Sequence, residues 1–100
     1  MNDKSTILSQ EEIDIKLSEI EGWRQEGKYI KKDFIFLNYR EINKFLPYLT
    51  KTIVDHNHHP DFSFDSGVRK VAIQVTTHSK GGITNFDLNL ARTLNNWASE

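Results

Sequence analysis

The chain has 100 residues, with 13 lysines and arginines against 14 acidic residues, and its formal net charge is −1. This balance argues against a nucleic-acid-binding protein, which normally carries a basic patch. Cysteine is absent, which excludes disulfides, a thiolate nucleophile and a cysteine-type zinc site. No apolar run approaches the ~20 residues of a membrane span, and the first residues lack the apolar core of a signal peptide. We therefore expect one soluble, cytoplasmic domain over residues 1–100.

A first helix is predicted for residues 10–20. Ser9 and Glu12 have the spacing of a capping box, in which two side chains satisfy the free backbone groups of the first turn. Apolar residues then recur at helical spacing, and Gly22 is a suitable stop. These apolar residues are Ile13, Leu17 and Ile20.

Two hairpins are predicted, one on each side of a central helix. Gly27 and Gly67 supply the turn residues. In the last strand, Val71, Ile73 and Val75 share one face, and His78 ends the strand on the opposite face. The predicted arms are residues 23–25 and 28–36 in the first hairpin, and 62–64 and 68–77 in the second.

The central helix is predicted from the cap residue Asn38 to about Asp55. Pro47 lies inside it and removes a backbone donor. The apolar stripe passes the proline without changing phase, which favours one kinked helix over two separate helices. The stripe consists of Ile42, Phe45, Leu46, Leu49 and Ile53.

A third helix is predicted after Thr84, which forms a second capping pair with Asp87. Its apolar residues are Phe86, Leu90, Leu94 and Trp97. The complete order is α-β-β-α-β-β-α. This order predicts the α+β class, with a four-stranded antiparallel sheet and three helices on one face.

All four histidines lie in two places, His56-Asn57-His58-His59-Pro60 and Thr77-His78. Imidazole titrates near neutral pH, so such a cluster suits proton transfer or metal ligation. Three interpretations are open: a polar helix exit without chemistry, a metal site, or general acid–base catalysis. Spacing alone does not identify a reaction.

Several motifs together resemble the pterin-4a-carbinolamine dehydratase family over nearly the whole chain. Gly22-Trp23 and Phe34-Ile35-Phe36 are similar to its early landmarks. The more specific motifs are His58-His59-Pro60-Asp61, Thr77-His78, Gly81-Gly82-Ile83-Thr84, Asp87 and Asn89-Leu90-Ala91.

The resemblance implies an enzyme that dehydrates 4a-hydroxytetrahydropterin to quinonoid dihydropterin, a step in tetrahydrobiopterin recycling, without a metal or another cofactor. It implies that His58, His59 and His78 are catalytic, and we expect them to converge on one pocket. The residues assigned to substrate binding are Pro60, Asp61, Thr77 and Asp87. It also implies a homodimer or homotetramer.

A second hypothesis is a non-catalytic, dehydratase-like dimerisation or binding module. Two positions differ from the family pattern. Val54 stands where the family has an acidic residue, and Val68 stands where it has an aromatic residue. His56 has no counterpart in the family motifs, and we expect its side chain to be exposed.

Overall fold

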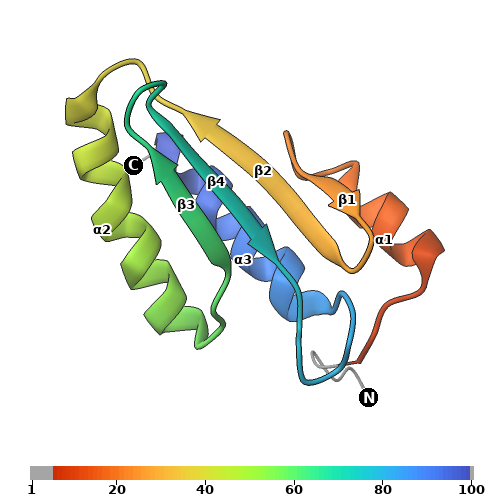
Figure 1. Cartoon of the computed structure of the whole chain (residues 1–100). Helices are drawn as coiled ribbons and strands as arrows, with labels where there is room; N and C mark the ends of the chain where they lie inside the picture. Colours follow the sequence, from red (N-terminus) through yellow and green to blue (C-terminus); the bar gives the residue numbers. More distant parts are fainter. Residues whose placement is uncertain (1–5, 100) are drawn as a thin grey trace.

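The computed structural model describes residues 6–99, with side chains described for residues 6–97. The elements follow the predicted order, helix, two strands, helix, two strands and helix (Figure 1). The bounds are α1 (Gln10–Leu17), β1 (Arg24–Glu26), β2 (Tyr29–Ile35), α2 (Tyr39–His56), β3 (Asp61–Asp65), β4 (Lys70–Val75), α3 (Asn85–Asn95) and the 3-10 turn η1 (Asn96–Ser99).

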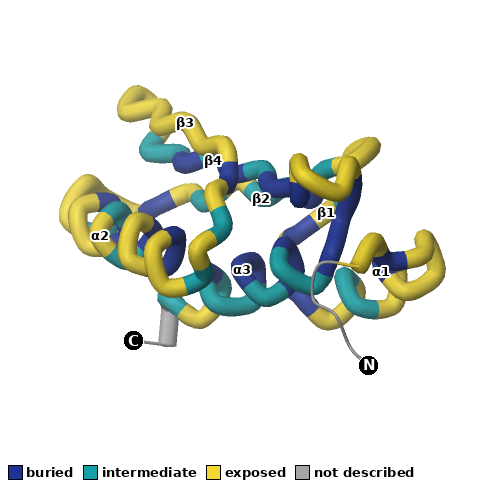
Figure 2. The backbone as a smooth tube through the Cα atoms, turned by 90° about the horizontal axis from the view of Figure 1, so that it is seen from below, coloured by how far each residue is buried: buried dark blue, intermediate teal, exposed yellow. Residues whose placement is uncertain are grey.

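The strands form one antiparallel sheet in the order β1-β2-β4-β3, so its central pair joins the two hairpins. In that pair Ile30 lies opposite Val75, and Phe34 lies opposite Val71. The helices form a layer along one face of the sheet, and no described helix covers the other face (Figure 2). The predicted α+β class is therefore confirmed.

The core lies between the sheet and helices α2 and α3. Phe45 of α2 is completely buried. Its ring centroid lies 5.0 Å from those of Phe34 and Phe36 and 5.5 Å from that of Trp97. Alternate residues of the central strands and the inner face of α3 complete this core: Ile30, Val71, Ile73, Val75, Leu88, Leu90, Ala91 and Leu94.

Helix α1 has the predicted Ser9–Glu12 capping box, but it ends at Leu17, short of the predicted end at residue 20. Ser18 is its C-cap. Ile20 is nevertheless buried, because the turn after the helix directs it into the core. Its apolar character continued the helical pattern beyond the true end of the helix.

The second hairpin turns over residues 66–69, so Val68 lies in the connection and not in the predicted strand 68–77. Arg69 adopts a left-handed conformation with φ 55°. Its carbonyl accepts a hydrogen bond from the N–H of Phe36, and its Nε donates to the Phe36 carbonyl, both at 3.0 Å. Contacts with the first hairpin therefore hold this turn.

Helix α2 runs without interruption through Pro47 and begins after the predicted cap Asn38. The prediction of one helix is confirmed. Phe45 and Leu49, on either side of the proline, are completely buried, so core packing supports the helix where a backbone hydrogen bond is missing. Within residues 6–99, no helix is long and apolar enough to cross a membrane.

Helix α3 begins after Thr84 with the predicted capping box to Asp87. It ends at Asn95. The sequence predicts Trp97 within this helix, but the residue lies in η1. The tryptophan still packs edge-on against Phe45 at 5.5 Å. Trp97 therefore packs against the core from the 3-10 turn, although the helix that was predicted to carry it ends earlier.

We predict that Phe45→Ala lowers the free energy of unfolding by about 3–5 kcal/mol, because it leaves a cavity at the centre of the core. Urea denaturation followed by circular dichroism measures this loss. Asn43→Ala, on the exposed side of the same helix, is the control and should change stability by less than about 0.5 kcal/mol. Equal losses in the two variants would contradict the central role of Phe45.

Candidate active site

The chain leaves helix α2 through Asn57, which has a left-handed conformation with φ 50° and ψ 44°. The N–H groups of Asn57 and His58 donate to the carbonyls of Val54 and Ile53 at 3.2 and 3.3 Å. Asparagine adopts this conformation more readily than most residues. The turn takes His58 off the helix and directs it to α3.

Asp87 joins this helix exit to the segment after β4. Its side chain is completely buried in the first turn of α3. Oδ1 lies 2.6 Å from Nε2 of His58. Oδ2 accepts hydrogen bonds from the Thr77 hydroxyl at 2.9 Å and from the Thr84 backbone N–H at 2.8 Å. Asp87 is therefore both a helix-capping residue and the partner of a histidine.

The ring of His58 is held on a second side by Phe86. The two rings are stacked, with centroids 5.6 Å apart and an interplanar angle of 30°. Only 13% of the His58 side chain is exposed. Phe86 thus fixes the plane of the imidazole, and Asp87 fixes the direction of its Nε2 edge. A side chain that transfers protons must be held in such a fixed orientation.

His78 lies in a tight loop beyond the sheet. Strand β4 ends at Val75, and not at Thr77 as predicted. The N–H of Thr77 donates to the Gly82 carbonyl at 3.0 Å, which closes the loop around His78. The exposed His78 ring lies edge-on to Tyr29, with centroids 6.2 Å apart. Beyond the end of the strand, Thr77 turns its hydroxyl to Asp87.

The remaining predicted residues of the first motif have different surroundings. His59 is exposed, whereas Pro60, which follows it, is buried. The structure joins His58, Thr77 and Asp87 by direct hydrogen bonds. Among the side chains described, those of residues 6–97, none makes a hydrogen bond to the His59 side chain.

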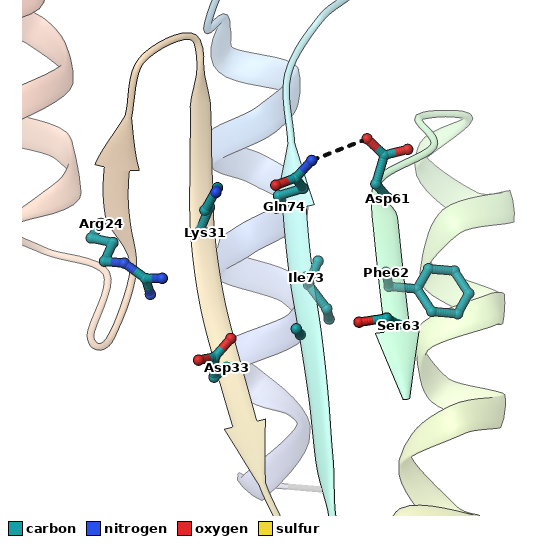
Figure 3. Close-up of a pocket in the computed structure, with 9 residues that line it drawn as sticks. Arg24, Lys31, Asp33, Asp61, Phe62, Ser63, Ile73 and Gln74 are labelled. Atoms are coloured by element: carbon teal, nitrogen blue, oxygen red, sulfur yellow. Dashed lines mark hydrogen bonds between the residues drawn. The ribbon is translucent and has the colours of Figure 1, made fainter. Parts of the chain in front are cut away.

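A groove of about 300 Å³ lies on the face of the sheet opposite the helices (Figure 3). Asp61 lines one end, where it accepts a hydrogen bond from Gln74 at 3.4 Å. The predicted catalytic histidines are not among its lining residues, so the groove is not the expected histidine pocket. The lining residues are Arg24, Lys31, Asp33, Asp61, Phe62, Ser63, Ala72, Ile73 and Gln74.

His56, expected to be exposed, is half-buried at the end of α2. Its Nε2 lies 3.0 Å from the Thr93 hydroxyl, so α3 covers it. Across residues 6–99, no group of three or more His, Cys, Asp or Glu side chains is arranged to hold a metal ion. His56 and His58 instead face separate partners on α3.

Sequence reasoning did not assign three residues to the site. The sequence predicts Thr84 as a helix cap and as part of a family motif, but without a role in the site. It predicts Phe86 as an apolar residue of the third helix and Tyr29 as a strand residue. Their contacts to Thr77, His58 and His78 join different elements. No local spacing signals contacts of this kind.

Comparison with known proteins agrees with this fold. The family model described as "Pterin 4 alpha carbinolamine dehydratase" matches residues 6–97. A protein of Sulfurisphaera tokodaii is 37% identical over 87% of this chain and 91% of its own length. A protein of Sulfolobus acidocaldarius is 36% identical over 88% of this chain and 94% of its own length. Both are named "Putative pterin-4-alpha-carbinolamine dehydratase".

A solved structure is similar over almost the whole fold. It is a crystal structure from Brucella melitensis titled "transcriptional coactivator/pterin dehydratase". The two structures have a TM-score of 0.83, and the match covers 90% of this chain and 96% of the other. The sequence identity is 24%, so this likeness concerns the fold alone.

We predict that Asp87→Ala lowers the free energy of unfolding by about 3 kcal/mol, since buried donors on Thr77 and Thr84 lose their acceptor. Urea denaturation measures the loss. Glu12→Ala is a matched control, because Glu12 has the same capping position in α1 but is exposed. Hydrogen bonds from the backbone and side chain of Ser9 lower the pKa of Glu12.

The control should destabilise the protein much less than Asp87→Ala. Equal effects of the two substitutions would mean that Asp87 acts only as a helix cap. A larger effect at Asp87 would instead reflect the buried hydrogen bonds that Glu12 does not make.

Proposed function

The chain belongs to the pterin-4-alpha-carbinolamine dehydratase family, and from this premise we propose that it dehydrates 4a-hydroxytetrahydropterin to quinonoid dihydropterin. The observation that carries the proposal is the contact of 2.6 Å between His58 and the buried Asp87. A carboxylate that orients an imidazole supports proton transfer by that imidazole.

The reaction removes water and requires two proton transfers. A ring N–H gives its proton to a base, and the electron pair of that bond forms the new C=N bond. The bond from C4a to the hydroxyl oxygen breaks, and an acid protonates the departing oxygen. We assign these transfers to His58, His59 and His78, because imidazole both accepts and donates protons near neutral pH.

We assign substrate binding to Pro60, Asp61, Thr77 and Asp87. Asp61 follows the first histidine motif at the start of β3, and its carboxylate suits the N–H donors of a pterin ring. Thr77 and Asp87 are buried, so they act on the substrate mainly by shaping the wall behind His58. The proposed setting is the cytoplasm, in a single domain that covers residues 1–100.

A second candidate function is a dehydratase-like binding module without activity. The observation that favours it is the number of exposed apolar side chains. Val54, where the family has an acidic residue, is 75% exposed. Others lie on β2, β3 and the adjoining turns: Ile35, Leu37, Phe62, Phe64 and Val68. Surfaces of this kind are typical of protein contacts.

We also propose that the protein is a homodimer or homotetramer that pairs through strand β3. This strand lies at the edge of the sheet, and all of its residues are exposed. An unpaired edge with apolar side chains is a template for another strand. A second copy of the chain supplies an identical edge, so antiparallel pairing with two-fold symmetry satisfies both copies.

We predict that His58→Ala, His59→Ala and His78→Ala each lower kcat for dehydration by at least about 100-fold, the usual contribution of a general acid or base. The rate is measured from the absorbance change as the carbinolamine loses water. His56→Ala is the control and should retain the wild-type rate, because His56 faces Thr93. A folded wild-type protein without activity would support the binding module instead.

We predict that the wild-type protein elutes as a dimer or tetramer in size-exclusion chromatography with light scattering. Phe64→Lys should shift it toward the monomer, because an edge-strand lysine opposes pairing. Ile15→Lys places the same charge at an exposed apolar position of α1 and should leave the assembly intact. A monomeric wild type, or dissociation only by Ile15→Lys, would contradict pairing through β3.

A further inference from the structure

Two threonine hydroxyls lie one behind the other next to Asp87. The hydroxyl oxygens of Thr84 and Thr77 are 2.8 Å apart, and both side chains are buried. Each hydroxyl has a single proton to donate. Thr77 gives its proton to Oδ2 of Asp87, so Thr84 must be the donor to Thr77. The hydrogen bonds therefore run in one direction, from Thr84 through Thr77 to Asp87.

Both acceptor positions of Asp87 Oδ2 are occupied. One is taken by the Thr77 hydroxyl and the other by the Thr84 backbone N–H. Oδ2 therefore carries no proton of its own. Asp87 also lies in the first turn of α3, where the helix dipole stabilises negative charge. These features favour the ionised form of Asp87, in which Oδ1 is an acceptor for His58.

His58 must then be the donor in its contact with Asp87. Its Nε2 lies 2.6 Å from Oδ1, so Nε2 holds a proton. A neutral imidazole has only one N–H, which leaves Nδ1 with a free electron pair. Among the side chains of residues 6–97, Nδ1 has no hydrogen-bond partner, and it is not buried. This nitrogen is open to a ligand.

We propose that Thr77 and Thr84 are positioning residues that hold His58 as its Nε2–H tautomer, so that Nδ1 is the base in the dehydration. The inference rests on the proposed dehydratase function. Nδ1 takes the proton of the substrate ring N–H, and the electron pair of that bond forms C=N as the bond from C4a to oxygen breaks. Asp87 stabilises the resulting imidazolium. His59 or His78, as its imidazolium, gives the proton that turns the leaving hydroxyl into water.

The test compares hydroxyl-free and hydroxyl-bearing variants of Thr77. Long-range ¹H–¹⁵N NMR reads the tautomer of His58 directly, without substrate. The wild type should show protonated Nε2 and unprotonated Nδ1. Thr77→Val should give a mixture of tautomers and lower kcat by about 10- to 100-fold, the range for a lost hydrogen bond to a charged group. KM should change little, because valine keeps the shape of the wall behind His58. Thr77→Ser should restore both readings.

Thr52→Val is the matched control, since the Thr52 hydroxyl is also buried but donates to the Tyr48 carbonyl within α2. It should leave the tautomer and kcat unchanged. An active wild type with the proton on Nδ1 would overturn this inference but not the proposed dehydratase function. An unaltered tautomer and kcat in Thr77→Val would do the same. The wild-type spectrum decides even where a variant does not fold. An inactive wild type with the Nε2–H tautomer would overturn the proposed function, and with it the role of Nδ1 as the base.

Discussion

A single buried carboxylate, that of Asp87, holds the candidate site together. Burying a charge is unfavourable unless hydrogen bonds replace its water. Asp87 meets this condition through Thr77, Thr84 and His58. The same bonds hold the first turn of α3, the loop after β4 and the exit from α2 in one arrangement. Loss of any one partner takes a hydrogen bond from a buried polar group.

The sheet makes this arrangement possible because β4 is one of its two central strands. It pairs with β2 on one side and β3 on the other, and its inward residues Val71, Ile73 and Val75 are almost completely buried. The loop that carries Thr77 and His78 therefore starts from a rigid support. Side chains on rigid elements hold their geometry more precisely than side chains on free loops.

Much of the fold was predictable because its signals are local. Both capping boxes and the passage of α2 through Pro47 follow from residues close together in the sequence. The turn at Arg69 was not predictable, since contacts with Phe36 hold it. The histidine motifs identified the candidate region. They did not show that Asp87 contacts His58, because that contact spans 29 positions of the chain and depends on the left-handed turn at Asn57.

Three side chains in or near the candidate site contribute differently to stability. Asp87 stabilises two segments at once, because the same oxygen that accepts the Thr77 hydroxyl also caps α3. The Thr77 hydroxyl is one of two donors to Asp87 Oδ2. The Thr84 N–H still donates to this oxygen when the Thr77 hydroxyl is removed. Val54, four residues before His58, is 75% exposed, so the fold tolerates an acidic residue there as well as valine. Valine at position 54 is therefore not required for folding.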